Sequence, residues 1–412
     1  MSCLLVNSYD IRGGASRAAY RLHKGLLSID AESIFYVFSK DGNDSTVIEA
    51  KPSFNKILAK ISPLINKLPL AFYPGRKKAN FSPSFYYDNI PSHNSDIIHL
   101  HWIADGFPWI EGLAKFKKPI VWTLHDMWAF TGGCHYDEGC EKYIKECGNC
   151  PQLGSNKEND LSRRIWQRKK EAWKNLDITI VTPSRWLAEC ARSSSIFRGK
   201  SVEVIPYGLD TEIYKPSNKI LAREKLSLPV DKKLILFGGI NASSDSRKGF
   251  QHLEPALKKL AEEKFAGTAE LVIFGSSEPV KRPDFALKAN YMGTINEDSN
   301  LAMLYSAADV FVAPSVQDNL PNTVMESISC STPVVAFDMG GMPDMVEHKK
   351  NGYLAKPFDT NDLAGGIEWI LEDSERNKKL GEAAREKALR EYSLEIQANR
   401  YLNLYKELLG HG

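Results

Sequence analysis

Short apolar segments alternate with longer amphipathic segments along nearly all of the 412 residues. The apolar segments are almost continuous in Val, Ile, Leu and Phe, as in CLLVNS at 3–8 and DVFVAPS at 309–315. Strands of this kind are buried on both faces, which happens when helices cover both sides of a parallel sheet. The sequence therefore predicts an α/β fold built from Rossmann-like parallel sheets.

The strand-helix alternation runs in two series, which predicts two Rossmann-like domains facing each other across a cleft. The stretch IPYGLDTEIYKPSNK at 205–219 separates the series with two prolines, a glycine and polar residues. We place an N-terminal domain at 1–208, a C-terminal domain at 209–390, and a final helix at 391–412 that packs back on the first domain. In open sheets of this type, ligands bind beyond the carboxyl ends of the strands.

The bulk composition excludes several classes of protein. A formal net charge of +2 gives no general affinity for polyanions, so no nucleic-acid partner is expected. The sequence has no run of about 18 apolar residues, so no bilayer-spanning helix is expected. The N-terminus MSCLLVNSYD does not resemble a signal peptide, which makes the cytoplasm the expected compartment.

Two acidic residues, Asp318 and Glu326, stand eight positions apart before the buried strand TPVVAF. The intervening Pro321 and Asn322 predict a turn and a helix start, with Asp318 in the loop and Glu326 about one turn inside the helix. Backbone N–H groups at a helix start favour anions, and a carboxylate accepts hydrogen bonds from hydroxyls. The pattern suits a ligand that carries phosphates and sugar hydroxyls; a solvated loop with an ordinary acid is the alternative.

Two further turns follow the first strand of each series. Gly13 and Gly14 permit a tight strand-to-helix turn with close backbone approach, although a plain turn is the alternative. Arg247 and Lys248 precede Gly249 and a helix, where two cations can neutralise a diphosphate; a solvated basic turn is the alternative. Neither turn has the G-x-G-x-x-G spacing, which disfavours a nicotinamide oxidoreductase.

One histidine stands at a position where such sheets expose functional groups. His125, in TLHD, lies at the carboxyl end of an apolar strand, which favours a role in a site over a structural one. His99 and His101 alternate with apolar residues in IIHLHW, and we interpret both as mainly structural.

Several motifs together resemble those of the family-4 GT-B glycosyltransferases. GGAS, TLHD, IPYGLDT, RKGF, the D-x7-E pattern, STPVVAFDMGGMPDMV and NGYL occur in the order found in that family. Within the family, HDMW and FTGGCHY followed by clustered cysteines resemble bacterial capsule and exopolysaccharide enzymes of the colanic-acid type. The resemblance implies an N-terminal acceptor-binding domain and a C-terminal domain that binds the nucleotide-sugar donor.

The resemblance also assigns roles in the C-terminal domain. Glu326 would hold the ribose hydroxyls of the donor, and Asp318 would contact the transferred sugar. Asn319, Leu320 and Pro321 would lie near that sugar and the phosphates. The first acid of the motif is Asp where the family usually has Glu, a departure that bears on sugar preference.

The remaining implied roles involve the leaving group and the opposing wall. Lys248, with Arg247, would bind the diphosphate leaving group. Gly13 and Gly14 would shape the wall of the site opposite the donor. His125 would contact the sugar near the reacting carbon. The family often has an arginine after the first strand of this domain, whereas this chain reads GGIN at 238–241, so Arg247 is the candidate to compensate.

The function implied by the resemblance is retaining, metal-independent transfer of a hexose-type sugar from a nucleotide-diphosphate sugar. The acceptor would be a glycan or a lipid-linked oligosaccharide in bacterial surface polysaccharide biosynthesis. A sugar-nucleotide epimerase or hydrolase of the same fold is one alternative, and an inactive scaffold is another. Catalysis is expected to need no cofactor.

Four cysteines, Cys134, Cys140, Cys147 and Cys150, lie in the loop 132–153 and end in a CxxC pair. In a reducing compartment, a structural zinc site is the leading interpretation, with disulfides and free thiols as alternatives. The loop directly follows TLHD, so we expect it to shape the mouth of the acceptor site.

The segment 51–78 carries seven Lys or Arg residues and no acid, and its apolar residues recur at helical spacing. Such a basic amphipathic stretch can lie on an anionic bilayer and meet a lipid-linked acceptor. A surface helix packed on its own domain is the alternative. The protein is thus expected in the cytoplasm, with peripheral contact at the inner face of the membrane as one interpretation.

Overall fold

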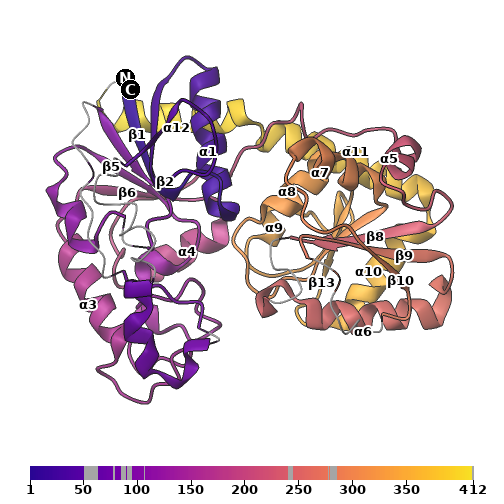
Figure 1. The fold of residues 1–412 in the computed structure, drawn as a ribbon, viewed down its shortest axis with the longest axis horizontal. Helices are drawn as coiled ribbons and strands as arrows, with labels where there is room; N and C mark the ends of the chain where they lie inside the picture. The colour runs from indigo at the N-terminus through magenta and orange to yellow at the C-terminus, as the bar shows by residue number, and fades with distance from the viewer. Residues whose placement is uncertain are drawn as a thin grey trace. The chain divides into compact units, whose positions relative to one another are not determined.

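The computed structural model forms two compact units, Met1–Pro206 with Gln397–Gly412 (unit 1) and Tyr207–Ile396 (unit 2). Each unit has its own parallel sheet (Figure 1). The described residues are 1–50, 64–77, 79–84, 90, 95–105, 107–239, 245–276, 278 and 285–410.

Unit 1 has a seven-stranded parallel sheet in the order β3-β2-β1-β4-β5-β6-β7. Its strands are β1 (Ser2–Tyr9), β2 (Glu32–Ser39), β3 (Val47–Glu49), β4 (Ile97–Leu100), β5 (Ile120–Thr123), β6 (Ile178–Thr182) and β7 (Val202–Val204). The chain order reverses between β1 and β4, and such a reversal is where open α/β sheets bind ligands.

Helices cover both faces of this sheet (Figure 1). The helices are α1 (Gly13–Ser28), α3 (Leu161–Trp173), α4 (Arg185–Ser193) and α12 (Leu394–Leu408). On one face, apolar residues of α1 and α12 share a core with β1, β2 and β4, including Leu22, Tyr401 and Tyr405. The chain therefore ends by returning to the unit in which it began.

Unit 2 has a six-stranded parallel sheet in the order β10-β9-β8-β11-β12-β13. Its strands are β8 (Lys233–Gly238), β9 (Ala269–Phe274), β10 (Lys288–Tyr291), β11 (Val310–Ala313), β12 (Val334–Phe337) and β13 (Gly352–Ala355). The order reverses between β8 and β11, which places a second switch point here.

The helices of unit 2 again lie on both faces of the sheet (Figure 1). The principal ones are α5 (Lys219–Lys225), α6 (Phe250–Leu260), α7 (Asp298–Ala307), α8 (Asn322–Ser329), α9 (Met342–Met345), α10 (Thr360–Glu372) and α11 (Ser374–Glu391). The apolar stripes of α6 and α10 share a core with β8, β9, β11 and β12, including Leu257, Ile367 and Val335.

The prediction of an α/β protein with two Rossmann-like sheets is confirmed. Strands β3 and β13 are only three and four residues long, too short for periodicity to separate them from loops.

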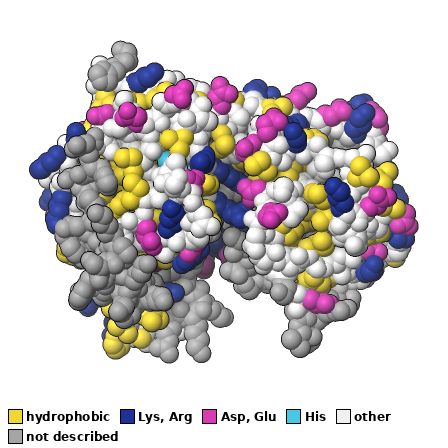
Figure 2. Space-filling model, turned by 45° about the horizontal axis from the view of Figure 1, so that its top comes forward, with side chains coloured by type: hydrophobic (Ala, Val, Ile, Leu, Met, Phe, Trp, Pro, Cys, Tyr) yellow, Lys and Arg dark blue, Asp and Glu magenta, His cyan; other side chains and the backbone are white. Residues whose placement is uncertain are grey.

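The surface and the helices agree with the bulk composition. On the face that Figure 2 presents, Lys and Arg side chains are interspersed with Asp and Glu side chains. None of the helices in the described part of the chain is long and apolar enough to cross a membrane. Residues 51–63 and Lys78 of the basic amphipathic segment lie outside the described residues, as do 240–244.

Candidate functional site

The switch point of unit 2 brings together the loops that follow β8 and β11. Arg247 and Lys248 lie in a short 3-10 turn, Ser246–Lys248, immediately before α6. The backbone N–H of Val316, beyond β11, donates to the carbonyl of Arg247 at 2.8 Å. The two cations predicted from the sequence therefore do lie at the ligand-binding edge of this sheet.

Gly249 makes this close approach of the two loops possible. Its φ is +75°, and a Cβ there would lie 1.7 Å from the carbonyl oxygen of Pro314. Any other residue would meet backbone that cannot move aside cheaply, in addition to an unfavourable left-handed conformation. Gly249 is thus required by packing, and it fixes the position of Lys248 directly before it.

Lys248 forms an ion pair with Asp318, its Nζ donating to Oδ2 at 2.6 Å. Asp318 also accepts from the N–H of Asn319 at 3.0 Å, and its carbonyl accepts from the N–H of Gly341 at 3.0 Å. Burial opposes ionisation of this carboxyl, but Lys248 and Arg247 outweigh burial and hold the pKa of Asp318 below its usual range. Asp318 is therefore a fixed carboxylate that positions the ammonium group.

Glu326 lies inside α8, as its place in the sequence predicted. The helix begins at Asn322, with Pro321 as the N-cap residue. The Glu326 side chain is 3% exposed, and its Oε2 accepts a hydrogen bond from the hydroxyl of Tyr305 at 3.2 Å. Burial and the neighbouring Glu326 both raise the pKa of Tyr305, so the phenol stays a donor.

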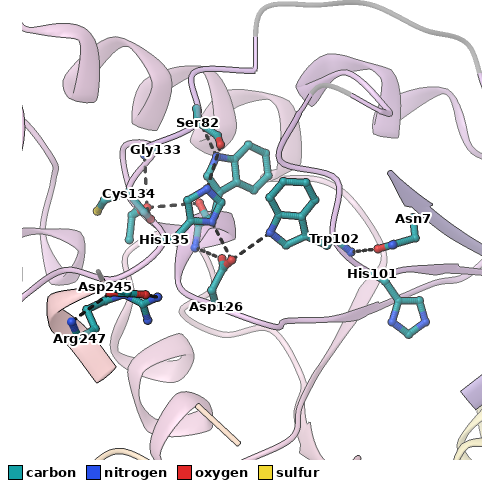
Figure 3. Close-up of polar contacts among 12 residues, drawn as sticks. Asn7, Ser82, His101, Trp102, Asp126, Gly133, Cys134, His135, Asp245 and Arg247 are labelled. Atoms are coloured by element: carbon teal, nitrogen blue, oxygen red, sulfur yellow. Dashed lines mark hydrogen bonds and ion pairs between the residues drawn. The ribbon is translucent and has the colours of Figure 1, made fainter. Parts of the chain in front are cut away.

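Arg247 points its guanidinium at a carboxylate. Its Nη2 lies 2.6 Å from Oδ2 of Asp245, and the Asp245 side chain also accepts from the Arg247 N–H at 3.0 Å (Figure 3). Together with Lys248, this arrangement holds two cations in the turn before α6. Asn319, Leu320 and Pro321 continue from Asp318 into α8, as expected for a segment lining the same edge.

The switch point of unit 1 carries Gly13 and Gly14. Helix α1 starts at Gly13, whose φ is +84°, and a Cβ built there would meet no atom within 4 Å. Among the described residues, no side chain caps this helix at Arg12. The start of α1 therefore has open space beside Gly13, as expected for a glycine that permits close approach.

His125 follows β5 and is 9% exposed. Its Nε2 lies 3.1 Å from Nδ1 of His101, which follows β4. Burial lowers the pKa of His125 to about 4, with Asp126 opposing the shift only in part. The imidazole is thus neutral at physiological pH and suited to hydrogen bonding, not to carrying charge.

A second polar network, around Asp126, was not found in the sequence (Figure 3). Asp126 accepts from Trp102 Nε1 at 3.1 Å, and its Oδ2 lies 2.7 Å from Nδ1 of His135. The Nε2 of His135 lies 2.9 Å from the hydroxyl oxygen of Ser82, and the Trp102 and His135 rings stack at 5.6 Å. This network fastens the cysteine loop to the ends of β4 and β5.

The four loop cysteines, Cys134, Cys140, Cys147 and Cys150, all carry free thiols. Burial, reinforced by Cys147, raises the pKa of Cys134 well above its usual range. Among the residues described, however, no three His, Cys, Asp or Glu side chains are grouped so as to hold a metal ion. Zinc binding by the four cysteines therefore stays a prediction, which metal analysis of the purified protein can test.

Comparison with known sequences places the chain in a family. Residues 12–213 match the family model described as Glycosyltransferase Family 4, and residues 218–387 match the one described as Glycosyl transferases group 1. An uncharacterised glycosyltransferase of Methanocaldococcus jannaschii is 30% identical over 319 residues, which cover 73% of this chain and 79% of that protein. A D-inositol 3-phosphate glycosyltransferase of Corynebacterium aurimucosum is 25% identical, over 76% of this chain and 72% of that protein.

Solved structures show the same fold. The sucrose-phosphate synthase of Thermosynechococcus elongatus superposes with a TM-score of 0.70 at 20% identity, with all of both chains covered. HepE of Anabaena, in complex with UDP-glucose, superposes with a TM-score of 0.65 at 16% identity, over 99% of this chain and 100% of that chain. The chain therefore belongs to the family-4 glycosyltransferases of GT-B fold.

Proposed function

We propose that this glycosyltransferase moves a hexose-type sugar from a nucleoside-diphosphate donor held by unit 2, with retention of configuration. The observation that carries the proposal is the group formed by Lys248, Asp318 and Glu326 at the switch point between β8 and β11. The UDP and UDP-glucose found in HepE support a donor of this chemical class.

In this proposal, Lys248 stabilises the leaving diphosphate. An ammonium group has three N–H donors, of which Asp318 accepts one, so others can reach phosphate oxygens. The bond between the anomeric carbon and the diphosphate oxygen breaks, while the acceptor oxygen forms its bond on the same face. The acceptor's proton passes to an oxygen of the leaving diphosphate, which keeps the charge balanced.

Arg247 and Lys248 would supply the positive charge that a divalent ion supplies to diphosphates elsewhere. Transfer is therefore expected to continue at an unchanged rate in the presence of EDTA. The proposed acceptor is a glycan or lipid-linked oligosaccharide of bacterial capsule or exopolysaccharide biosynthesis, supported by the HDMW and FTGGCHY resemblance.

Glu326→Gln is expected to raise the KM for the donor by roughly 10- to 100-fold, with a smaller change in kcat. Hydrogen bonds between a carboxylate and ribose hydroxyls are worth about 1.5–3 kcal/mol. Because the ribose lies away from the reacting bond, the variant loses the same binding energy in the ground state and in the transition state. The measurement is initial-rate kinetics over a range of donor concentrations.

Tyr305→Phe is the matched control, because it removes the hydrogen bond to Glu326 and keeps the carboxylate and the ring. A smaller rise in KM than for Glu326→Gln is expected. Equal KM values for wild type and Glu326→Gln would remove Glu326 from the donor site.

We further propose that the enzyme contacts an anionic membrane through an exposed apolar face at residues 64–72. Leu64, Leu68 and Phe72 recur every four residues and are 68%, 62% and 88% exposed, beside an exposed Lys67. Apolar side chains at this spacing next to a cation fit insertion at the interface of anionic lipids.

Replacing Leu68 and Phe72 by serine is expected to lower partitioning to vesicles of phosphatidylglycerol and phosphatidylethanolamine about tenfold or more. Burying one such side chain is worth about 1.5–3 kcal/mol, and each 1.4 kcal/mol is a factor of ten. The control replaces Ile220 and Leu221 of α5, which are 58% and 55% exposed in unit 2. Equal vesicle sedimentation of the two double variants would reject this membrane face.

A further inference from the structure

The ends of β4 and β5 place two histidines against each other. Leu100 pairs with Trp122 in the parallel register, and one residue beyond Leu100 stands His101, whose Nδ1 lies 3.1 Å from Nε2 of His125. The backbone of His101 is held on both sides, its N–H donating to Val6 at 2.9 Å and its carbonyl accepting from Trp122 Nε1 at 3.0 Å. The His101 ring therefore has little freedom to turn away.

The surroundings of His101 restrict its protons. Its side chain is 3% exposed, and its ring centroid lies 4.2 Å from that of His99. In the described part of the chain, Nε2 of His101 has no hydrogen-bond partner. Burial lowers the pKa of both His101 and His125, so both rings are neutral and one proton is shared between the facing nitrogens.

Two arrangements of that proton are chemically available. If His125 donated from Nε2, His101 would carry its own proton on the partnerless Nε2, leaving a buried N–H unsatisfied. If His101 donates from Nδ1, its Nε2 carries no proton and is only an unpaired acceptor. Buried N–H groups without a partner are rarer in proteins than buried acceptors without one, so this arrangement is favoured. The second arrangement leaves His125 protonated on Nδ1.

We propose that His101 is a positioning residue, which donates from Nδ1 to Nε2 of His125 and thereby holds His125 as the Nδ1–H tautomer. The tautomer of His125 and the orientation of its ring are then set by His101 at the end of β4. The catalytic consequence rests on the proposed function and on the contact with the transferred sugar that the family resemblance implies for His125. His101, interpreted as structural from the sequence, thus acts on the site through its neighbour.

The test compares His101→Asn with His101→Leu. Asn places an amide N–H close to where Nδ1 of histidine lies, whereas Leu has a similar size and no donor. The full-length protein is labelled with ¹⁵N-histidine, and the ring nitrogen shifts of His125 are identified by their loss in His125→Gln. Initial-rate kinetics with a donor sugar are measured on the same three proteins.

We expect the Nδ1–H tautomer of His125 in wild type and in His101→Asn, and a shift toward Nε2–H in His101→Leu. The kcat of His101→Leu is expected to fall roughly tenfold, about the value of one hydrogen bond, and His101→Asn to recover most of it. An Nε2–H tautomer in wild type, or an unchanged tautomer in His101→Leu, would overturn the inference. The NMR result stands independently of turnover, so wild type without any transferase activity would count against the proposed function alone.

Discussion

Replacing Lys248 by methionine is expected to lower kcat by about 10²- to 10³-fold, the cost of removing one preorganised donor from a developing negative charge. The ammonium group lies 2.6 Å from Asp318, which fixes it before the donor arrives. The attraction between this ammonium group and the diphosphate grows as negative charge moves onto the diphosphate. Removing the ammonium group therefore lowers kcat and does not only raise KM. Single-turnover rates with saturating donor measure this effect directly.

Two variants make the Lys248 result specific. Lys248→Arg keeps a cation in place and is expected to recover part of the rate, although its planar fork differs from an ammonium group. Lys378→Met removes a cation from α11 that is 69% exposed in its side chain, and it is expected to leave kcat unchanged. A kcat for Lys248→Met within threefold of wild type would show that another group stabilises the leaving diphosphate.

Lowering the pH from 7 to 5 is expected to destabilise unit 1 before unit 2. Burial lowers the pKa of His23 and His125 to about 4 and that of His99 to about 3, and it also lowers the pKa of His101 well below its usual value. Unfolding exposes these rings, which then take up protons near pH 6.5. The unfolded state therefore binds more protons, and the free energy of unfolding falls as the pH drops from about 6.5 toward 4.

The expected size of this pH effect is large. Each histidine contributes a slope of up to about 1.4 kcal/mol per pH unit, so the upper limit for the four together is about 5.6 kcal/mol per pH unit. Among the described histidines of unit 2, burial also lowers the pKa of His252. Unfolding of unit 2 therefore takes up fewer protons than unfolding of unit 1, and its stability depends less on pH. Urea unfolding at several pH values gives the slope, and hydrogen exchange resolved by peptide assigns it to a unit.

His99→Gln serves as the internal check on this slope. The ring of His99 lies 2.7 Å from Thr123 Oγ1 and 2.6 Å from the Tyr405 hydroxyl, so Gln keeps a polar group there without a titrating ring. Its slope is expected to be lower by about 1.4 kcal/mol per pH unit. An unchanged slope, or earlier loss of protection in unit 2, would contradict the assignment.

The parts of the site that follow from local sequence were predictable. Asp318 and Glu326 take their places because a proline-marked turn and a helix start separate them over eight residues. Arg247 and Lys248 lie before α6 because a short turn and Gly249 follow one another directly in the chain. Each of these placements depends on neighbours within about one loop and one helical turn.

The parts that depend on strand register were not predictable. His101 meets His125, and Trp102 meets Asp126, only because β4 and β5 pair with Leu100 opposite Trp122. The sequence analysis treated His101 as part of an alternating strand, since periodicity reports which face a residue takes and not which residue lies across from it. His135 joins the same network through a loop whose path no local rule determines.

The central claim is that unit 2 binds a nucleoside-diphosphate sugar through Lys248 and its neighbours. The most direct measurement incubates the purified protein with UDP-, GDP-, ADP-, dTDP- and CMP-sugars, with and without EDTA, while thermal stability and nucleotide release are followed. Stabilisation and nucleotide release with one diphosphate sugar, both insensitive to EDTA and with the release strongly slowed in Lys248→Met, is the expected result. If no nucleotide sugar binds at millimolar concentration, the claim is contradicted.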